Sequence, residues 1–358
     1  MITLEVRRDD FSKTRFVEAP APELEEGQVL FALDRFALTS NNVSYAAAGD
    51  MLDYWGFFPA EEGWGRIPAM GFADVAASRH PDVAEGARYF GFYPMTSHLV
   101  VRAQGTANQF VDAAPHREKH APAYRQYANV AADPVHVPER EDQIILLRGL
   151  FLTSFLVDDF LADNDFFGAR SFVVSSASSK TAIALAFQLS RRGQGEVIGL
   201  TSLGNAAFVE GLGCYDRVVP YGEIRSIAPG TKTVFVDHSG DGAVVDTLHR
   251  HLANDLTHSC IVGATHWSAE GRSGDLPGPE PAFFFAPSQI VKRSKEWGAE
   301  VFQQRLGEDW TRFVDFTDGW LEVVRGRGRD AVQQTYLDVL GGRAKPHQGH
   351  VLSLAEER

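Results

Sequence analysis

The sequence predicts a two-domain α/β protein, in which a β-rich domain accompanies a doubly wound parallel-sheet domain. Three observations support this fold class. The chain has 358 residues, a length typical of two domains. Hydrophobic residues make up 44% of it, which is enough for a large core. Near Asp142 the hydrophobic pattern changes from strand-like runs to alternating strands and helices.

The N-terminal third has the pattern of strands joined by loops. Residues 28–38 are rich in Val, Phe, Leu and Ala, and they lie between a Pro/Gly-rich segment and Ser40-Asn41-Asn42, which predicts a strand. Residues 49–93 are crowded with glycines and aromatic residues. They predict a loop-rich β region without a long helix.

Strand–helix alternation over the central part of the chain predicts a parallel sheet covered on both faces. Apolar residues at helical spacing predict a long buried helix over 144–161. Short apolar runs predict strands at 171–175, 196–201, 217–219, 233–237 and 259–263. The stretches between them predict helices at 181–189, 205–212 and 244–252. This order is typical of a Rossmann-type nucleotide-binding domain.

The pattern changes again after Gly271, where a Gly/Pro-rich loop leads to Phe283-Phe284-Phe285 and to helical stretches that contain Trp. The last segment, near 349–354, predicts a closing strand. We therefore expect residues 1–140 together with 286–358 to form the β-rich domain, and residues 141–285 to form the nucleotide-binding domain.

Composition narrows the classes of partner. There are 47 acidic and 34 basic side chains, giving a net charge of −13, so nucleic acid and anionic membranes are poor partners. Two cysteines give neither a disulfide framework nor a zinc clamp. The first ten residues lack a signal-peptide core, and the most apolar stretch, 144–157, is shorter than the roughly 20 residues of a membrane span. We expect a soluble cytoplasmic protein, for which a homodimer is allowed.

A Ser-rich turn after the first central strand is the candidate phosphate site. At this point a strand ends and a helix begins, so free N–H groups and the positive end of the helix dipole meet. Small side chains let a pyrophosphate approach the backbone. The expected cofactor contacts in the turn are Ser176, Ala177, Ser178, Ser179, Lys180 and Thr181.

This turn has three other interpretations: a P-loop, the turn of a short-chain dehydrogenase, and a polar turn without a ligand. Lys180-Thr181 resembles the end of a P-loop, but Val174 and Ser179 stand where that motif needs glycine. A short-chain dehydrogenase needs a Tyr followed four residues later by Lys, and no Tyr of the chain has that partner. A polar turn that binds no ligand remains open.

Four stretches share the pattern of a known superfamily. They are residues 20–30 (PAPELEEGQVL), 41–49 (Asn41-Asn42-Val43-Ser44-Tyr45, then Gly49), 176–182 and 212–221 (LGCYDRVVPY). Together they resemble the medium-chain dehydrogenase/reductase superfamily, in particular its zinc-free quinone and enoyl reductase branch. The chain stands as an outlying branch, because Ser179, Lys180 and Ala182 replace family glycines and a Gly-His-Glu segment is absent.

The resemblance implies a GroES-like β-rich catalytic domain, completed by the C-terminal segment, beside a Rossmann-type domain. It also implies that residues 41–49 form a loop over the nicotinamide of a bound cofactor. It places Tyr221 near the adenine ribose, although simple packing at the sheet edge remains open for this residue.

NADPH is the expected cofactor. An NAD site needs an acidic residue after the second strand to bind the ribose hydroxyls. Here Thr201, Ser202 and Asn205 occupy that region, and their hydroxyl and amide groups suit a 2′-phosphate. Lys180 is the nearest cation that the topology places there. Gly263 and Thr265 follow the fifth strand, at the edge where ligands bind, and are further expected contacts.

Tyr45 and Tyr54 are the candidate proton donors. Reduction by hydride creates negative charge that a donor must neutralise, and a phenol with an ordinary pKa near 10 is protonated at neutral pH. Asn42 is expected to position the carboxamide or the substrate, and His266 after the fifth strand is a further candidate donor. The Cys and His ligands of the zinc-dependent branch have no counterparts, so no metal site is expected. Core packing remains open for each Tyr, and a buried structural role for His266.

The abundant aromatic residues favour an apolar small-molecule substrate: an enone, a quinone or an enoyl thioester. Those expected to line an apolar cleft are Trp55, Phe57, Phe58, Trp267, Phe283, Phe284 and Phe285. The sequence therefore predicts a zinc-independent NADPH-dependent oxidoreductase. The alternative is a non-catalytic NADP(H)-binding sensor or scaffold derived from a reductase.

Overall fold

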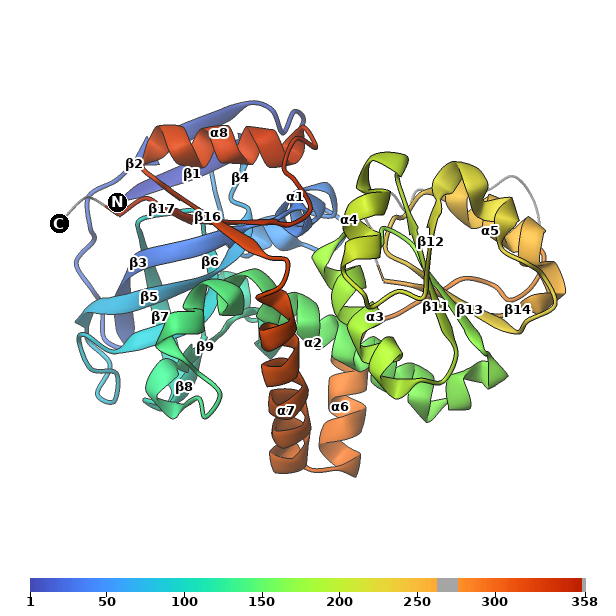
Figure 1. Cartoon of the computed structure of the whole chain (residues 1–358). Helices are drawn as coiled ribbons and strands as arrows, with labels where there is room; N and C mark the ends of the chain where they lie inside the picture. Colours follow the sequence, from blue (N-terminus) through green and yellow to red (C-terminus); the bar gives the residue numbers. More distant parts are fainter. Residues whose placement is uncertain (263–275, 356–358) are drawn as a thin grey trace. The chain divides into compact units, whose positions relative to one another are not determined.

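The computed structural model describes residues 1–262 and 276–355 (Figure 1). It divides into two compact units, Met1–Leu146 with Glu322–Arg358 and Leu147–Leu321. One unit is β-rich and the other contains a parallel sheet, so the predicted α/β class is confirmed. None of the helices in the described ranges has the length and apolar content needed to cross a membrane.

The first unit is built around a closed barrel. Its larger sheet has the order β16-β17-β3-β5-β6-β9-β8-β7, and β3 also pairs with β7, which closes the six strands from β3 to β7 on themselves. The strands are β3 (Gln28–Leu38), β5 (Pro68–Ser78), β6 (Arg88–Pro94), β7 (His98–Gly105), β8 (Gln109–Asp112), β9 (Gln126–Asn129), β16 (Glu322–Arg327) and β17 (Gln348–Ser353). A smaller sheet joins β1 (Ile2–Arg7), β2 (Thr14–Glu18) and β4 (Trp64–Gly65).

Aromatic side chains fill the barrel. They come from alternate positions of the strands, where side chains point to one face. Phe31 is completely buried and its ring lies 5.2–6.1 Å from those of four other buried aromatic residues. These are Tyr89, Tyr93, Phe110 and Tyr127. This aromatic packing therefore stabilises the barrel without the help of a ligand.

The C-terminal segment completes this unit. β17 pairs antiparallel with β3, with Val351 opposite Ala37, and β16 pairs parallel with β17. Between them lies α8 (Arg329–Leu340), whose buried Tyr336 donates a hydrogen bond to the Phe11 carbonyl. Strands far apart in the sequence thus share one sheet.

The second unit is a parallel sheet with the order β12-β11-β10-β13-β14-β15. The strands are β10 (Ser171–Val174), β11 (Glu196–Thr201), β12 (Arg217–Pro220), β13 (Thr233–Asp237), β14 (Leu256–Ile261) and β15 (Ala282–Phe283). In chain order this sheet reads 3-2-1-4-5-6, the order of a Rossmann fold. Its helices are α3 (Lys180–Arg192), α4 (Ala206–Gly211) and α5 (Gly242–Leu252), with α6 (Ala286–Glu296) and α7 (Ala299–Thr317) following.

α6 and α7 belong to the unit with the parallel sheet, and not to the β-rich domain as the sequence predicts. Residues 286–321 were expected in the β-rich domain, but the compact units place them with the parallel sheet. The reason is packing against α2 (Glu141–Asp163) and α3. The ring of Phe313 on α7 lies 5.0 Å from that of Phe151 on α2, and Arg293 on α6 binds Asp159 of α2 at 2.6 Å.

An ion network holds the start of α2 against the barrel unit. Arg88 of β6 donates to both carboxylate oxygens of Glu141, at 2.8 and 2.7 Å, and also to Asp34 and Asp74. Burial raises the pKa of Glu141, but the hydrogen bonds and charge of Arg88 outweigh this effect, so its pKa falls below the ordinary value. One guanidinium thus neutralises carboxylates from three elements.

We predict that Arg88→Met lowers the free energy of unfolding by about 3 kcal/mol, because it leaves partly buried carboxylates without their cation. The contribution of Glu141 is present above its unfolded pKa and is lost as pH falls through its lower folded pKa. The loss measured by urea unfolding should therefore be large at pH 7 and shrink below about pH 4. Arg102→Met, which breaks the exposed pair with Glu25, is the control and should cost at most about 1 kcal/mol. Equal losses in both variants would contradict the account.

Candidate functional site

The strand order of the parallel sheet reverses between β10 and β13, and Ser175 joins the two strands there. Its hydroxyl donates to Asp237 Oδ1 at 2.6 Å and accepts the backbone N–H groups of His238 at 2.8 Å and Ser239 at 3.1 Å. Ser175 and Asp237 are both buried. In open α/β sheets, ligands bind at the carboxyl ends of strands at such a reversal. This interaction fixes the edge at which the candidate site lies.

The turn after β10 approaches β11 closely. The Ala177 N–H donates to the Leu200 carbonyl at 2.9 Å, and the Ala177 carbonyl accepts the Tyr215 hydroxyl at 3.0 Å. A Cβ on Gly199 would lie 2.9 Å from the Ala177 Cβ, so this position of β11 requires glycine. Ser176 has φ of 48°, in the left-handed region, which turns the chain sharply before α3.

The start of α3 carries the features of an anion site. Ser179 is the N-cap, and its hydroxyl accepts the Ala182 N–H at 3.3 Å. The first N–H groups of a helix have no partner within the helix. Lys180 is partly buried, and burial lowers the pKa of its ammonium group to about 8. Small side chains, a helix N-terminus and a cation thus meet in one turn, which suits a phosphate.

The end of β11 lies beside this turn. Asn205 donates from Nδ2 to the Ser178 hydroxyl at 3.1 Å. Thr201 is buried and Ser202 is exposed. The Tyr221 hydroxyl accepts the Ser176 N–H at 2.8 Å, which uses one of the turn's donors within the protein. The expected cofactor residues from 176 to 221 therefore share one sheet edge, whereas Gly263, Thr265 and His266 lie outside the described residues, as does Trp267.

The two candidate tyrosines lie together in the barrel unit. Tyr45 belongs to α1 (Ser40–Ala47) and Tyr54 to a short 3₁₀ turn, Tyr54–Gly56, and their ring centroids are 4.7 Å apart. Tyr54 is buried and Tyr45 partly so. Burial raises the pKa of both phenols well above the ordinary value, which keeps them protonated at neutral pH. Either phenol therefore holds its proton at neutral pH.

The segment expected as a loop over the nicotinamide is the helix α1. Thr39 and Asn42 form a capping box at its start, which stabilises the first turn. Asn42 is buried, accepts the Thr39 N–H at 2.7 Å through Oδ1, and donates from Nδ2 to the Pro68 carbonyl at 2.8 Å. Both polar atoms of its side chain thus bind protein.

The aromatic residues expected in a cleft are in different environments. Phe57 and Phe58 are buried in a cluster with Tyr54, and Trp55 belongs to the barrel core. Phe283 and Phe285 are 52% and 51% exposed. Only a share of these rings is therefore accessible to a substrate.

Sequence reasoning missed two histidines. His238 directly follows β13, its Nε2 is buried without a partner in the described part of the chain, and burial lowers its pKa to about 3. Its place after the fourth strand was a signal for it. His120 binds Asp53 Oδ2 through Nε2 at 2.9 Å. These two residues are 67 positions apart, so no local spacing could have predicted the pair.

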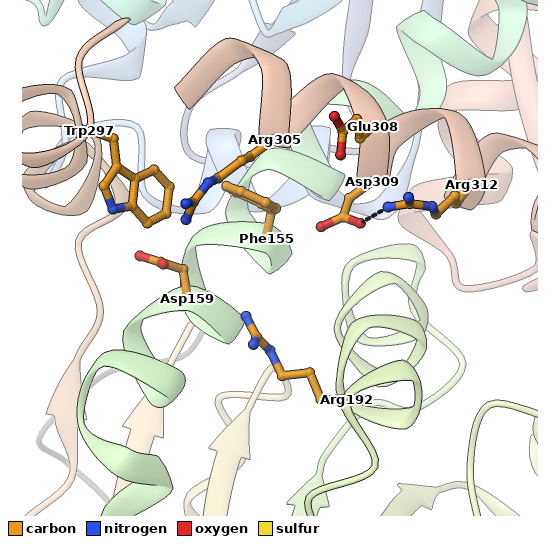
Figure 2. A pocket seen from close by; sticks show the side chains of 8 residues that line it. All are labelled: Phe155, Asp159, Arg192, Trp297, Arg305, Glu308, Asp309 and Arg312. Atoms are coloured by element: carbon orange, nitrogen blue, oxygen red, sulfur yellow. Dashed lines mark hydrogen bonds and ion pairs between the residues drawn. The ribbon is translucent and has the colours of Figure 1, made fainter. Parts of the chain in front are cut away.

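A cavity of about 240 Å³ opens between α2, α3 and α7 in the second unit (Figure 2). Its lining is mostly charged and consists of Phe155, Asp159, Arg192, Trp297, Arg305, Glu308, Asp309 and Arg312. Arg312 pairs with Asp309 at 2.9 Å, and Arg192 pairs with Asp158 at 2.7 Å. These ion pairs already involve two of the charged arginines that line the cavity. A lining of charged side chains does not suit an apolar substrate.

The sequence pattern of one family, described as "Protein of unknown function (DUF2855)", matches residues 36–345. The chain belongs to this family. No curated protein matches the sequence.

Solved structures share the fold at low sequence identity. CurA from Vibrio vulnificus, solved in complex with NADPH, is similar with a TM-score of 0.60 and 11% identity over 100% of both chains. Glucose dehydrogenase from Haloferax mediterranei, in complex with NADP, Zn and gluconolactone, gives 0.56 and 12% over 100% of both. The quinone oxidoreductase from Coxiella burnetii gives 0.53 and 14% over 99% of both. The predicted fold, a β-rich domain together with a Rossmann-type parallel-sheet domain, is confirmed.

We predict that Ser175→Ala lowers the free energy of unfolding by about 3 kcal/mol, because it removes a donor from the buried Asp237 carboxylate and an acceptor from two N–H groups. Urea unfolding measures the loss. Ser202→Ala removes an exposed hydroxyl from the same sheet edge and should change stability by less than about 0.5 kcal/mol. A Ser175→Ala protein as stable as the Ser202→Ala protein would show that the strand ends do not depend on this hydroxyl.

Proposed function

We propose that the protein is an NADPH-dependent oxidoreductase that reduces an apolar enone, quinone or enoyl thioester. The observation that carries this proposal is the turn of small residues and Lys180 at the strand-order reversal of a 3-2-1-4-5-6 sheet. The NADPH in CurA and the NADP in glucose dehydrogenase, which share the fold, support it. When bound, NADPH supplies a hydride.

The residues of the turn fit such a cofactor. In the proposal the N–H groups at the start of α3 bind the pyrophosphate, and the Lys180 ammonium pairs with the 2′-phosphate. Asn205 and Ser178 are held together by their hydrogen bond and offer further polar contacts beside them. Thr201-Ser202 places no carboxylate where it would repel a phosphate. The chain's own groups therefore favour NADPH over NADH.

The tyrosine pair supplies the proton in the proposal. A substrate that accepts a hydride gains negative charge on a neighbouring atom, and a protonated phenol can neutralise it. Tyr45 is the more accessible of the two, and Tyr54 packs against its ring. No three His, Cys, Asp or Glu side chains in residues 1–262 and 276–355 form a metal-binding group.

A sensor or scaffold that binds NADP(H) without catalysis is the second candidate. One observation favours it: the Tyr221 hydroxyl already accepts the Ser176 N–H, so the turn offers fewer donors than a glycine-rich one. Both candidates bind the dinucleotide. Only oxidation of NADPH in the presence of an acceptor separates them.

Calorimetric titration tests cofactor choice. We predict that NADPH binds more tightly than NADH, and that Lys180→Met weakens NADPH by about tenfold while leaving NADH nearly unchanged, because one charged contact is lost. Since burial lowers the pKa of Lys180 to about 8, its positive charge is lost as pH rises through that value. The Kd for NADPH should therefore rise about tenfold between pH 7 and pH 9, and that for NADH should stay flat.

Arg191→Met is the matched control for this titration. Arg191 lies in the last turn of α3, away from the helix start, and should leave both affinities unchanged. Equal affinity for the two cofactors, or equal losses in both variants, would reject Lys180 as the 2′-phosphate contact. Absence of binding to either cofactor would reject the proposed function itself.

Steady-state kinetics tests the proton donors. We predict that Tyr45→Phe or Tyr54→Phe, whichever removes the true donor, lowers kcat by about 10²–10⁴-fold with menadione or 2-cyclohexen-1-one as acceptor. The Kd for NADPH should barely change, because the phenol acts on the substrate. A chelator should leave the rate unchanged. A fully active double variant would exclude both tyrosines, and no oxidation of NADPH with any acceptor would favour the sensor.

A further inference from the structure

Asp53 and His120 form a hydrogen-bonded pair in the barrel unit that the proposed reaction does not yet use. Asp53 Oδ2 lies 2.9 Å from His120 Nε2 and 2.5 Å from the ammonium group of Lys119. His120 is 8% exposed, whereas the Asp53 side chain is 43% exposed. The pair therefore connects the protein surface with its interior.

The second ring nitrogen of His120 is chemically available. Nδ1 is buried and has no hydrogen-bond partner among the residues that the structure describes. Because Nε2 faces a carboxylate, the hydrogen of a neutral imidazole is placed on Nε2, which leaves a lone pair on Nδ1. A buried polar atom without a partner costs free energy, so a purely structural link between two loops gains nothing from it.

The imidazole is part of the aromatic cluster that contains both candidate donors. Its ring lies 4.5 Å from that of Phe57, which in turn lies 5.2 Å from Tyr54 and 5.4 Å from Tyr124. Asp53 directly precedes Tyr54 in the chain, with a left-handed φ of 56°. The acidic member of the pair and a candidate donor are thus held by the same short turn.

Arg117 holds the two segments together. It is completely buried, donates from Nη1 to the Phe57 carbonyl at 2.8 Å, and also donates to the Tyr124 carbonyl. Its guanidinium lies 4.8 Å from the ring centroids of Phe57 and Phe58. This clamp fixes the imidazole against the cluster, as a catalytic pair requires.

We propose that Asp53 and His120 form an acid–base dyad that carries protons between solvent and the Tyr45–Tyr54 pair. An imidazole oriented by a carboxylate is the usual arrangement for proton transfer by histidine. Because Nδ1 has no hydrogen-bond partner among the described residues, the proposed transfer to a phenol runs through one bridging water molecule. This inference rests on the proposed function.

The proton balance is complete. The acceptor gains a hydride, with two electrons, from NADPH, which becomes NADP⁺, and a tyrosine gives its O–H proton to the resulting anion. The imidazolium of His120 gives its Nδ1 proton to that tyrosinate through the water and keeps its Nε2–H on Asp53. The neutral imidazole then takes a proton from solvent at Nδ1 through the same water. The sum is NADPH plus one proton plus acceptor giving NADP⁺ and the reduced acceptor.

Other titratable and charged groups surround the dyad. They are Lys119, whose ammonium group pairs with Asp53, Arg117 and His116 on the same segment, and the phenols of Tyr54 and Tyr124, whose rings pack against Phe57. Because the dyad is proposed to act on the tyrosine pair and not on the cofactor, its effect should appear in kcat rather than in cofactor affinity.

Kinetics of the full-length protein with NADPH and 2-cyclohexen-1-one test the dyad. We expect His120→Gln to lower kcat at least about tenfold and to remove a step from its pH profile between about pH 5 and 8. Asp53→Asn should shift that step, and the Kd for NADPH should stay unchanged in both variants. His347→Gln, at a histidine of the same unit that pairs with Glu322 and not with the dyad, is the matched control and should keep the profile.

The outcomes separate the two proposals. If His120→Gln keeps the pH profile, or lowers kcat equally at every pH together with the melting temperature, the dyad is structural and this inference is overturned while the proposed function stands. If the unaltered protein binds no NADPH, both fail. Nitrogen NMR of the unaltered protein adds a readout independent of activity. At pH 8 the dyad requires the hydrogen on Nε2, and a hydrogen on Nδ1 would overturn it.

Discussion

The Ser175 hydroxyl joins the carboxyl ends of two adjacent strands through its 2.6 Å hydrogen bond to the buried Asp237. After β10 the chain continues to β11 and β12 on one side of the sheet, and after β13 it continues to β14 and β15 on the other side. The bond therefore lies where the strand order reverses. It fixes the residue from which the turn into α3 begins, and that turn carries Ser178 and Lys180 to the sheet edge. The proposed cofactor site depends on this constraint, since a looser strand end would not hold the helix start in register with β11.

Much of the fold follows from local pattern. The strands at 28–38, 196–201 and 233–237 have the predicted bounds, because an apolar run of strand length between turn residues has few other solutions. The assignment of α6 and α7 did not follow, because an amphipathic helix shows that it has an apolar face but not which surface covers it. Contacts such as that between Phe313 and Phe151 decide this, and they join residues 162 positions apart.

The candidate site also contains parts that the sequence predicts and parts that it does not. The Ser-rich turn was predictable because chain order alone places a strand end, a turn and a helix start together. The proximity of Tyr45 and Tyr54 follows from their closeness in sequence. The Asp53–His120 pair was not predictable, since the barrel strands between its members bring them together. Asn42 is the opposite case. Its position before Tyr45 predicts a contact with cofactor or substrate, but its side chain forms the capping box of α1 and donates to the Pro68 carbonyl.

Backbone amide NMR of the protein with and without NADPH tests the central claim most directly, because it locates the cofactor without requiring a substrate. We predict that the largest chemical-shift changes fall on the amides from Ser176 to Ala182 and from Thr201 to Asn205. Smaller changes are expected along α5, which lies elsewhere in the same unit. Changes confined to the charged cavity around Arg305, or no changes at saturating NADPH, would contradict a dinucleotide site at the Ser-rich turn.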